Sequence, residues 1–504
     1  MTETFNQPHF GLDSRLDLNA KTDTVITLDL AGGGQICVGN DLNETTCFVL
    51  VEQGDWFEPD LPFIRDLIEP GMQALDIGAN HGLFALTIAE KLAGTGRVVA
   101  YEPSAKISSL LRQSRELNGY GTLEIVAAAM SDQAGEGTLF AGSASENASL
   151  KKSAKPGGVM PAQETVPIVT LDDEWRRLGE PALDFIKLDV EGNEAEVIRG
   201  GQACLSAVDP ILVFEVSGDA QQAAKLVNQL GQFGFASYRV QPAMNALVPA
   251  SFTAFSNFQV NLVAIKAGRA AWLKDRCRLI DEWPNVAPPD DPAWPESWAE
   301  GLQALRPGGT DGLVADASNL LCRQLQALTM VAQAGHVPLA DRTAAVRACL
   351  DRWTALELPA EQPGLAIPRH FLKAEIARLA GMREMVSGAS LEIMKLLDRP
   401  DHLPVEPFPA APGWDYASGR LDPQEWLRIQ AVELLTRNCC HSVRFADQRL
   451  LPILDHSHEH ALYPPYLERC RQLMRIRASL QVGLRRNSKL DPSLVNGGFV
   501  RQAA

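Results

Sequence analysis

Several features that would assign the 504-residue chain to a membrane or secreted class are missing from its sequence. No uninterrupted apolar run comes near the ~20 residues that a membrane-spanning helix needs. The first residues, MTETFN, have neither the basic start nor the apolar centre of a secretion signal. The nine cysteines are scattered and include no C-x-x-C pair, which predicts reduced core residues and not a disulfide framework. We therefore expect a cytoplasmic protein with no membrane span.

An excess of positive charge is also missing. The sequence has 62 acidic residues against 46 lysines and arginines, a formal net charge of −16. Because binding to nucleic-acid phosphates requires a basic face, this balance argues against a nucleic-acid partner. We interpret the basic cluster between Arg471 and Arg486 as a solvated helix face.

What the sequence does contain begins with a small-residue stretch after a predicted buried strand. It reads Asp76-x-Gly78-x-Asn80-x-Gly82, and an apolar run typical of a helix follows. Such a strand–turn–helix unit is expected to present free amide N–H groups at a helix N-terminus, where an anionic or strongly polar group binds. The spacing does not fit the G-x-G-x-x-G loop of dinucleotide-binding proteins, which disfavours a pyrophosphate ligand.

The stretch instead resembles the first motif of class I methyltransferases that use S-adenosylmethionine (SAM). By that resemblance, Asp76 orients the loop and, directly or through water, the ammonium group of the cofactor. Gly78 and Gly82 let the backbone approach the methionine part, with Asn80 between them. The alternative is an ordinary strand–glycine turn–helix unit of some α/β protein.

Acidic and polar residues also follow the next two predicted strands. Glu102 ends the strand predicted at 97–101, where a carboxylate is placed to accept both hydroxyls of a ribose. Ser131 and Asp132 follow the third strand, at the point where an adenine edge would be read. For Asp132, capping of a turn is the competing interpretation.

A cation and two carboxylates crowd the end of the fourth predicted strand. Alternation along the segment 183–194 puts Lys187 and Asp189 on one side, with Glu191 continuing the same series. Burial of such charges is costly unless they have partners, and perturbed charges in α/β proteins are frequent at functional sites. A purely structural ion pair is the alternative.

The remaining strand signals complete an α/β sheet. A fifth strand ends at Glu215, and the segments 236–240 and 258–265 are expected to form a closing strand pair. We therefore predict a class I methyltransferase fold, which is Rossmann-like with seven strands and an antiparallel last strand. Its ligands bind at the carboxyl ends of the strands, where the strand order reverses.

The ordered motifs together resemble the FkbM-type methyltransferase family over roughly residues 45–266. The resemblance rests on the loop 76–82, on Tyr101-Glu102-Pro103, and on FIKLDVEGNE at 185–194 followed by VIRGG at 197–201. It implies a SAM-dependent enzyme that transfers a methyl group to a hydroxyl of a sugar, glycan or related metabolite. His81 stands where the family often has an apolar residue, so it is either an added polar group or a loop variation.

Composition and pattern divide the chain into five parts. Its 504 residues predict two or three domains. Strands at 24–30 and 47–52 around three glycines suggest an N-terminal hairpin, with a short helix at 61–68. Beyond residue 266 the family resemblance stops, and helical patterns at about 317–335, 340–356, 370–397, 423–438 and 464–483 indicate an all-α domain. The predicted parts are a flexible tail (1–21), the hairpin and helix (22–70), the methyltransferase domain (71–266), a linker (267–300) and the all-helical domain (301–504).

The chemistry predicted from these residues is a methyl transfer aided by a general base. A sugar hydroxyl is a poor nucleophile near neutral pH, so Asp189 or Glu191 is expected to take its proton while Lys187 positions the carboxylate or a substrate oxygen. In the alternative, Asp189 and Glu215 hold a Mg²⁺-like ion. A separate H-x-H-x-H motif at residues 456–460 is weighed as a zinc or copper site against a polar loop between helices.

Two other functional classes compete with this interpretation. A dehydrogenase would share the sheet but lacks its glycine loop here. The stronger competitor is a scaffold with a degenerate methyltransferase domain, whose helical half recruits a glycan-biosynthesis partner. Whether the first half is an active methyltransferase or a scaffold, we expect the helical half to bind the acceptor, a glycosyltransferase or a second copy of the chain.

Overall fold

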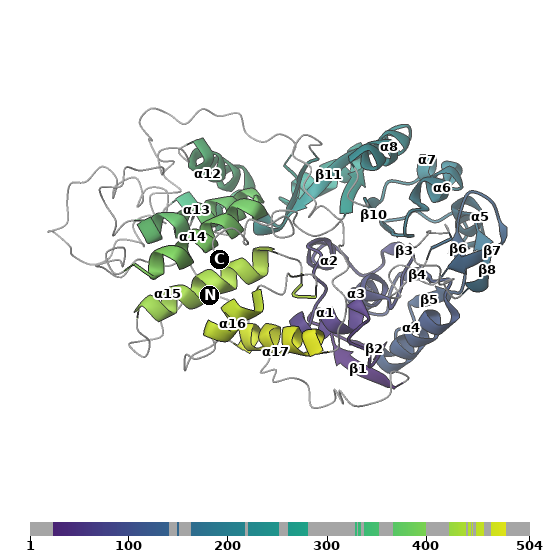
Figure 1. The fold of residues 1–504 in the computed structure, drawn as a ribbon. Helices are drawn as coiled ribbons and strands as arrows, with labels where there is room; N and C mark the ends of the chain where they lie inside the picture. Colours follow the sequence, from purple (N-terminus) through teal and green to yellow (C-terminus); the bar gives the residue numbers. More distant parts are fainter. Residues whose placement is uncertain are drawn as a thin grey trace. The chain divides into compact units, whose positions relative to one another are not determined.

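The chain falls into two compact units, which are described separately (Figure 1). The first unit draws its residues from Met1–Val240, Ala250–Leu273 and Gln472–Leu490, and the second from Gln241–Pro249 and Lys274–Arg471. The computed structural model describes residues 24–140, 149–150, 163–216, 220–250, 261–280, 328–329, 331–333, 337–351, 366–399, 423–439, 442–444, 446, 450–457 and 465–479.

A mixed sheet in the order β12-β11-β13-β10-β9-β3-β4-β5 carries the motifs. Strands β3, β4, β5, β9 and β10 are parallel, and β13 is antiparallel to β10 and β11. The chain runs outward from β3 to β5 and returns at β9, so the strand order reverses between β3 and β9, as predicted. The eighth strand, β12, was not predicted. The bounds are Gln73–Ile77 (β3), Arg97–Tyr101 (β4), Leu123–Val126 (β5), Phe185–Leu188 (β9), Ile211–Glu215 (β10), Ala236–Gln241 (β11), Ala246–Pro249 (β12) and Asn261–Ile265 (β13).

Helices connect the parallel strands, and local capping signals explain where they begin. Ser104 accepts a hydrogen bond from Ile107 N at the start of α4, and Thr170 accepts one from Asp173 N at the start of α5. Strand and helix side chains such as Leu75, Ile186 and Val197 form one buried core. The helices are α3 (Leu83–Leu92), α4 (Ala105–Asn118), α5 (Leu171–Arg177), α6 (Glu194–Arg199), α7 (Gln202–Ala207), α8 (Ala220–Gly231) and α9 (Ala267–Asp275).

A small three-stranded sheet, which was not predicted, lies between β5 and α5 in sequence. Its order is β6-β8-β7, with β6 at Ala129–Met130, β7 at Gly135–Phe140 and β8 at Gln163–Val169. Most of the Ser/Ala/Gly/Lys-rich stretch at 143–158, which the composition suggests is a loop, lies outside the described residues.

The N-terminal hairpin is real, but its second strand was placed wrongly. Strand β1 (Val25–Asp29) pairs antiparallel with β2 (Gln35–Gly39), directly across the glycine turn. The predicted strand at 47–52 belongs instead to helix α1 (Thr45–Gln53), in which residues 45–52 are all buried. A continuous apolar run has no polar face to reveal its period, so the sequence could not separate strand from helix. The predicted short helix is α2 (Asp60–Arg65).

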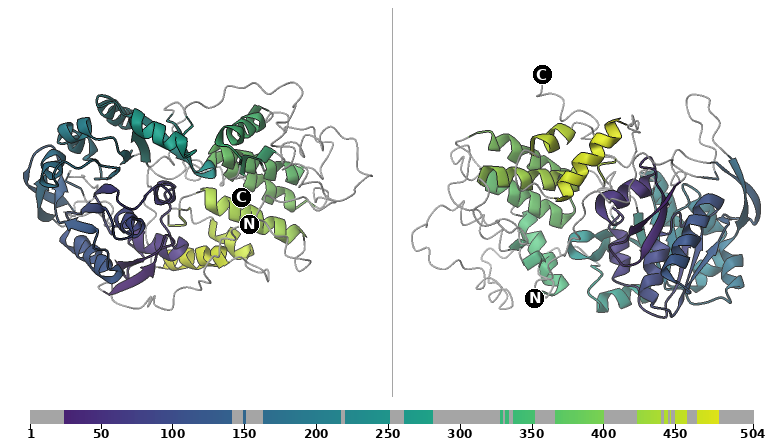
Figure 2. Two further views of the ribbon diagram at one scale, coloured as in Figure 1. Left: turned by 180° about the vertical axis from the view of Figure 1, so that it is seen from behind. Right: turned by 90° about the horizontal axis from the view of Figure 1, so that it is seen from below.

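The described part of the second unit is mainly helical, as predicted. It contains α12 (Leu339–Asp351), α13 (Ala366–Ala380), α14 (Arg383–Leu397), α15 (Pro423–Cys439), α16 (Leu450–Ser457) and α17 (Pro465–Ser479), of which α17 spans both units, together with the short helix η2 (Pro242–Met244). Helices α13, α14 and α15 lie side by side and share a buried core (Figure 2).

Three details of the C-terminal prediction need correction. The helix expected over 370–397 is two helices, because Gly381 adopts φ 76° between them. Helix α16 was not predicted. The linker expected at 267–300 begins with helix α9, while residues 281–300 lie outside the described part of the chain, as does the tail at 1–21. Among the described helices, none is both long and apolar enough to cross a membrane.

Candidate active site

The loop between β3 and α3 is held by its own backbone and by the end of β4. Gly78 N and Ala79 N both donate to Tyr101 O, at 3.0 and 2.9 Å. Asn80 N donates to Glu102 Oε2 at 2.9 Å, and Gly82 N donates to Ala79 O at 2.8 Å. The amide groups of the loop itself are therefore not free, because the loop uses them to fix its own shape.

Donors remain one step further along, in the first turn of α3. Leu83 and Phe84 are buried, and the described residues offer no acceptor to either N–H group. A buried helix N-terminus needs acceptors for such groups. These two N–H groups, at the positive end of a helix, fit the carboxylate of an amino-acid-like ligand.

Asp76 fastens the start of the same helix. Its Oδ2 accepts a hydrogen bond from Ala85 N at 2.9 Å, and the residue is 2% exposed. Burial raises the pKa of this carboxyl to about 7, while the charge of Lys187 and the bond from Ala85 act in the opposite direction. The side chain therefore fixes the position of the first turn of α3 relative to β3.

Gly78 brings the loop after β3 against the loop after β9. It adopts φ 84°, and a Cβ atom built on it would lie 1.7 Å from the carbonyl oxygen of Asp189. Since no side chain fits in that space, glycine is required both for the backbone angle and for the close approach.

Glu102 joins the ends of β3 and β4. Its Oε2 accepts from Asn80 N and its Oε1 accepts from Ser104 N at 2.8 Å. Burial raises the pKa of Glu102 to about 7, against the effect of these two bonds. Because a carboxylate has about four acceptor positions, two remain for the hydroxyls of a ribose.

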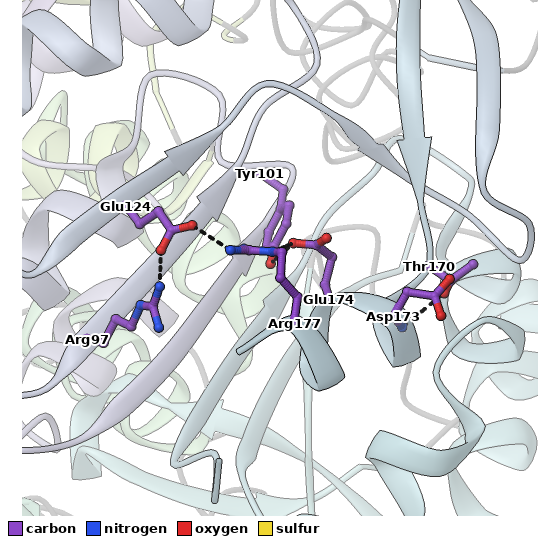
Figure 3. A network of polar contacts seen from close by, with 7 residues as sticks. All are labelled: Arg97, Tyr101, Glu124, Thr170, Asp173, Glu174 and Arg177. Atoms are coloured by element: carbon purple, nitrogen blue, oxygen red, sulfur yellow. Dashed lines mark hydrogen bonds and ion pairs between the residues drawn. The ribbon is translucent and has the colours of Figure 1, made fainter. Parts of the chain in front are cut away.

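Tyr101, whose carbonyl oxygen holds the loop, is itself anchored by a polar network (Figure 3). Its hydroxyl donates to Glu174 Oε2 at 2.9 Å, and Arg177 Nε donates to the same oxygen at 2.8 Å. Arg177 then reaches Glu124, which also pairs with Arg97. The network connects β4 and β5 to α5.

The predicted charge cluster at the end of β9 is present. Lys187 is 2% exposed, and its Nζ donates to Asp189 Oδ2 at 3.2 Å. Ligand atoms of Asp189, Glu191 and Glu215 lie within 4.8 Å of one another. The structure thus brings the predicted acids together, and oxygen ligands of this kind suit a hard divalent cation.

Asn193 and Glu194, at the start of α6, support the loop after β9, a role that the sequence did not reveal. Glu194 Oε1 accepts from Val190 N at 3.1 Å and from Gly192 N at 3.0 Å. Asn193 Nδ2 donates to Met130 O at 2.9 Å. Both residues stand in the motif that suggested the family, but a motif does not show which members support the loop.

Ser131 and Asp132 lie at the end of β6, next to that loop. Ser131 Oγ is 3.3 Å from Asn193 Nδ2, while Asp132 forms an ion pair with Arg199 at 3.2 Å. The competing interpretation of Asp132 was capping of a turn, whereas the contact seen in the structure is this ion pair with α6.

Buried polar residues from outside the motifs complete the site. Glu58, Asp60 and Asn261 are 5%, 5% and 3% exposed. Asn261 Oδ1 accepts from Lys187 Nζ at 3.0 Å, and Asn261 Nδ2 donates to Glu58 and Asp60, so Asn261 links both acids to the charge cluster. They lie in the loop before α2, in α2 and in β13, and sequence reasoning missed them because their spacing along the chain follows no motif.

The two histidine questions have different outcomes. His81 is 3% exposed, its Nδ1 lies 2.5 Å from Asn80 Oδ1, and burial lowers its pKa to about 4, so it is a neutral part of the loop. Of the H-x-H-x-H motif, His458 and His460 lie outside the described residues, as do Cys440 and His441. That hypothesis stays a prediction.

Part of the first unit matches a known protein family. Residues 76–237 match the methyltransferase FkbM domain. The chain is also 29% identical over 306 residues to the AMB antimetabolite synthetase AmbE of Pseudomonas aeruginosa, covering 52% of this chain and 13% of that protein. It therefore spans about an eighth of that relative's length.

Solved methyltransferases also align with the chain. A precorrin-6y C5,15-methyltransferase from Geobacter metallireducens aligns at 12% identity and a TM-score of 0.24, covering 41% of this chain and 88% of the other. A SAM-dependent O-methyltransferase from Thermotoga maritima aligns at 12% identity and a TM-score of 0.25, covering 49% and 94%. The fold itself is established above by the strand order.

Proposed function

Because residues 76–237 match the methyltransferase FkbM domain, we propose that the first unit is a SAM-dependent methyltransferase that acts on a hydroxyl group. One observation carries the proposal. A glycine loop and a buried acid, Glu102, lie at the ends of adjacent parallel strands, beside the point where the strand order reverses.

The residues at these strand ends fit the cofactor. The N–H groups of Leu83 and Phe84 would hold its carboxylate, and Asp76 its ammonium, directly or through water. Glu102 would accept from its ribose hydroxyls, with Ser131 and Asp132 near its adenine. When bound, the cofactor supplies an electrophilic methyl group.

The acids after β9 are the groups available to assist the acceptor. Asp189 or Glu191 would take the proton from the acceptor hydroxyl, while Lys187 holds the carboxylate of Asp189 at 3.2 Å. Asp189 and Glu215 holding Mg²⁺ is the alternative, and Glu191 would then be a third ligand. Assays with EDTA and with added MgCl₂ separate the two, since a base alone works in EDTA.

The acceptor class follows from the family resemblance, which favours a sugar, a glycan or a related metabolite. AmbE, which the chain partly matches, is named as an antimetabolite synthetase, and this supports including metabolites. The helical unit is proposed to recruit the acceptor, a glycosyltransferase or a second copy of the chain. The presence of Asp76, Glu102 and Asp189 in the sequence speaks against a degenerate scaffold.

Two measurements test the proposal. Calorimetry with SAM and with S-adenosylhomocysteine should give heat at one site per chain, whereas NAD should give none. Incubation with [methyl-³H]SAM and an extract of the source cell should label a product that mass spectrometry identifies. If neither cofactor form produces heat and no label is transferred, the enzyme assignment is wrong.

A further inference from the structure

Asn261 connects two charged groups at the centre of the first unit. Its Oδ1 accepts from Lys187 Nζ at 3.0 Å, and its Nδ2 donates to Glu58 Oε2 at 2.7 Å and to Asp60 Oδ2 at 3.1 Å. Lys187 continues the series by donating to Asp189 Oδ2 at 3.2 Å. We call the series Glu58/Asp60–Asn261–Lys187–Asp189 the tether.

The chemistry of the partners fixes the direction of the tether. An ammonium group offers only donors and an ionised carboxylate offers only acceptors, so the amide of Asn261 must turn its oxygen to Lys187 and its nitrogen to the acids. The reverse orientation would set donor against donor and acceptor against acceptor. An amide in this place orients its neighbours and carries no net charge.

Burial makes the tether strong and its disruption costly. Burial alone lowers the pKa of Lys187, but four surrounding carboxylates outweigh it and raise the pKa above its ordinary value. They are Asp189, Glu58, Asp60 and Glu215. The ammonium also lies 5.1 Å from the centre of the Phe84 ring. Lys187 is therefore charged, and its position is set from several sides.

Three of the five residues of the tether lie outside the segment that matches the FkbM domain. Glu58, Asp60 and Asn261 lie beyond residues 76–237, whereas Lys187 and Asp189 lie inside them. Glu58 and Asp60 enter from the segment around α2, and Asn261 is the first residue of β13. Segments distant in sequence thus converge on one lysine.

We infer that Asn261, Glu58 and Asp60 are positioning residues for methyl transfer, because they hold Lys187 in the place from which it orients the carboxylate of Asp189. The inference rests on the proposed function. It assigns to the N-terminal segment and to β13 a part in turnover that is separate from cofactor binding.

A charge-swap experiment tests this role. In Asn261→Asp, three carboxylates meet without the amide donor between them, so the tether should break. Adding Asp60→Asn to this variant restores the number of negative charges in the cluster. The double variant again contains one amide, now at position 60 in α2, and this amide can donate a hydrogen bond to the carboxylate at position 261. We measure apparent kcat and the KM for SAM from [methyl-³H]SAM with source-cell extract, and the affinity for S-adenosylhomocysteine by calorimetry.

We expect the substitution to lower turnover and to leave cofactor binding unchanged. Asn261→Asp should lower apparent kcat by about 100-fold, the order expected from misplacing a reacting group by about 1 Å, with the KM for SAM and the S-adenosylhomocysteine affinity within about twofold of wild type. The double variant should recover most of the lost kcat. A residue that served stability alone would not give recovery of kcat at constant cofactor affinity.

Two further variants keep the test decisive. Asp55→Asn neutralises an acid that pairs with Arg65 in the same segment but lies outside the tether, and it should retain wild-type kcat. If Asn261→Asp fails to fold, Asp60→Asn alone replaces it and should lower kcat without changing cofactor affinity.

The outcomes of the two proposals differ. Wild-type protein that binds no cofactor form and transfers no label contradicts the proposed function. Wild-type protein that transfers label, while Asn261→Asp or its substitute keeps full kcat or the swap gives no recovery, overturns the tether as a positioning device.

Discussion

The loops after β3 and after β9 touch at Gly78 and Asp189, yet they are built differently. The first loop is closed by backbone hydrogen bonds to Tyr101 and by Glu102, with its acids buried. The second is supported by side chains, and its acids Asp189 and Glu191 are partly exposed. Under the proposed function, the first loop would recognise the cofactor and the second would supply the reactive groups.

Asp189→Asn tests the reactive loop and should have the largest effect. Neutralising the expected base removes a contribution of about 10²–10⁴ in rate, while the amide keeps the shape of the side chain. Turnover of [methyl-³H]SAM should fall accordingly, with S-adenosylhomocysteine binding measurable by calorimetry. Full activity in this variant would remove Asp189 from the mechanism.

Gly78→Ala tests the contact between the loops. The added Cβ would lie 1.7 Å from Asp189 O, so the loops must separate, at a cost of about 3 kcal/mol or more in unfolding free energy and with loss of cofactor affinity. Gly54→Ala is the matched control, because Gly54 also has positive φ (70°) but its Cβ would meet nothing within 4 Å. The control should cost about 1–2 kcal/mol, from backbone strain alone. Equal costs in urea unfolding would show that the close approach is unimportant.

The buried acids of the rigid loop predict an effect of pH. The pKa values of Asp76 and Glu102 are raised from 3.8 and 4.5 to about 7 by burial, so the folded protein binds protons more tightly than the unfolded chain between these limits. Unfolding free energy should therefore fall as pH rises from about 4 to about 7, by at most about 4 kcal/mol for Asp76 and about 3 kcal/mol for Glu102.

Cofactor affinity should change in the opposite sense over the same interval. Ammonium and hydroxyl donors prefer ionised acceptors, so binding of S-adenosylhomocysteine should strengthen as pH rises through about 7. Glu102→Gln should reduce both pH dependences, since one of the two titrating groups is gone. An affinity that is constant from pH 5 to 8 would contradict the assigned roles.

Tyr101→Phe should have the smallest effect. It removes the hydroxyl that donates to Glu174, but Glu174 keeps its bond from Arg177, and the Tyr101 carbonyl still holds the loop. We expect a loss of about 1–2 kcal/mol in unfolding free energy and unchanged cofactor affinity. A large drop in affinity would mean that the network in Figure 3 acts on the site directly.

Sequence reasoning performed best where function imposes a local pattern. Asp76, Glu102 and Asp189 were each placed correctly at a strand end, because strand periodicity and turn residues are local properties. It failed for residues 47–52, where an evenly apolar run carries no period. The sequence also could not show which amides of the loop bond to the carbonyl oxygen of Tyr101, because that acceptor belongs to another strand.

By itself the sequence determined the parallel α/β unit, the glycine loop, the acids at the strand ends and the helical character of the C-terminal half. Tertiary structure alone decided that Glu58, Asp60 and Asn261 meet at Lys187, and that Glu191 and Glu215 approach Asp189. The physical reason is that strand ends and turns depend on neighbours along the chain. The partner of a buried charge depends instead on which distant segments the packed sheet brings within about 3 Å of it.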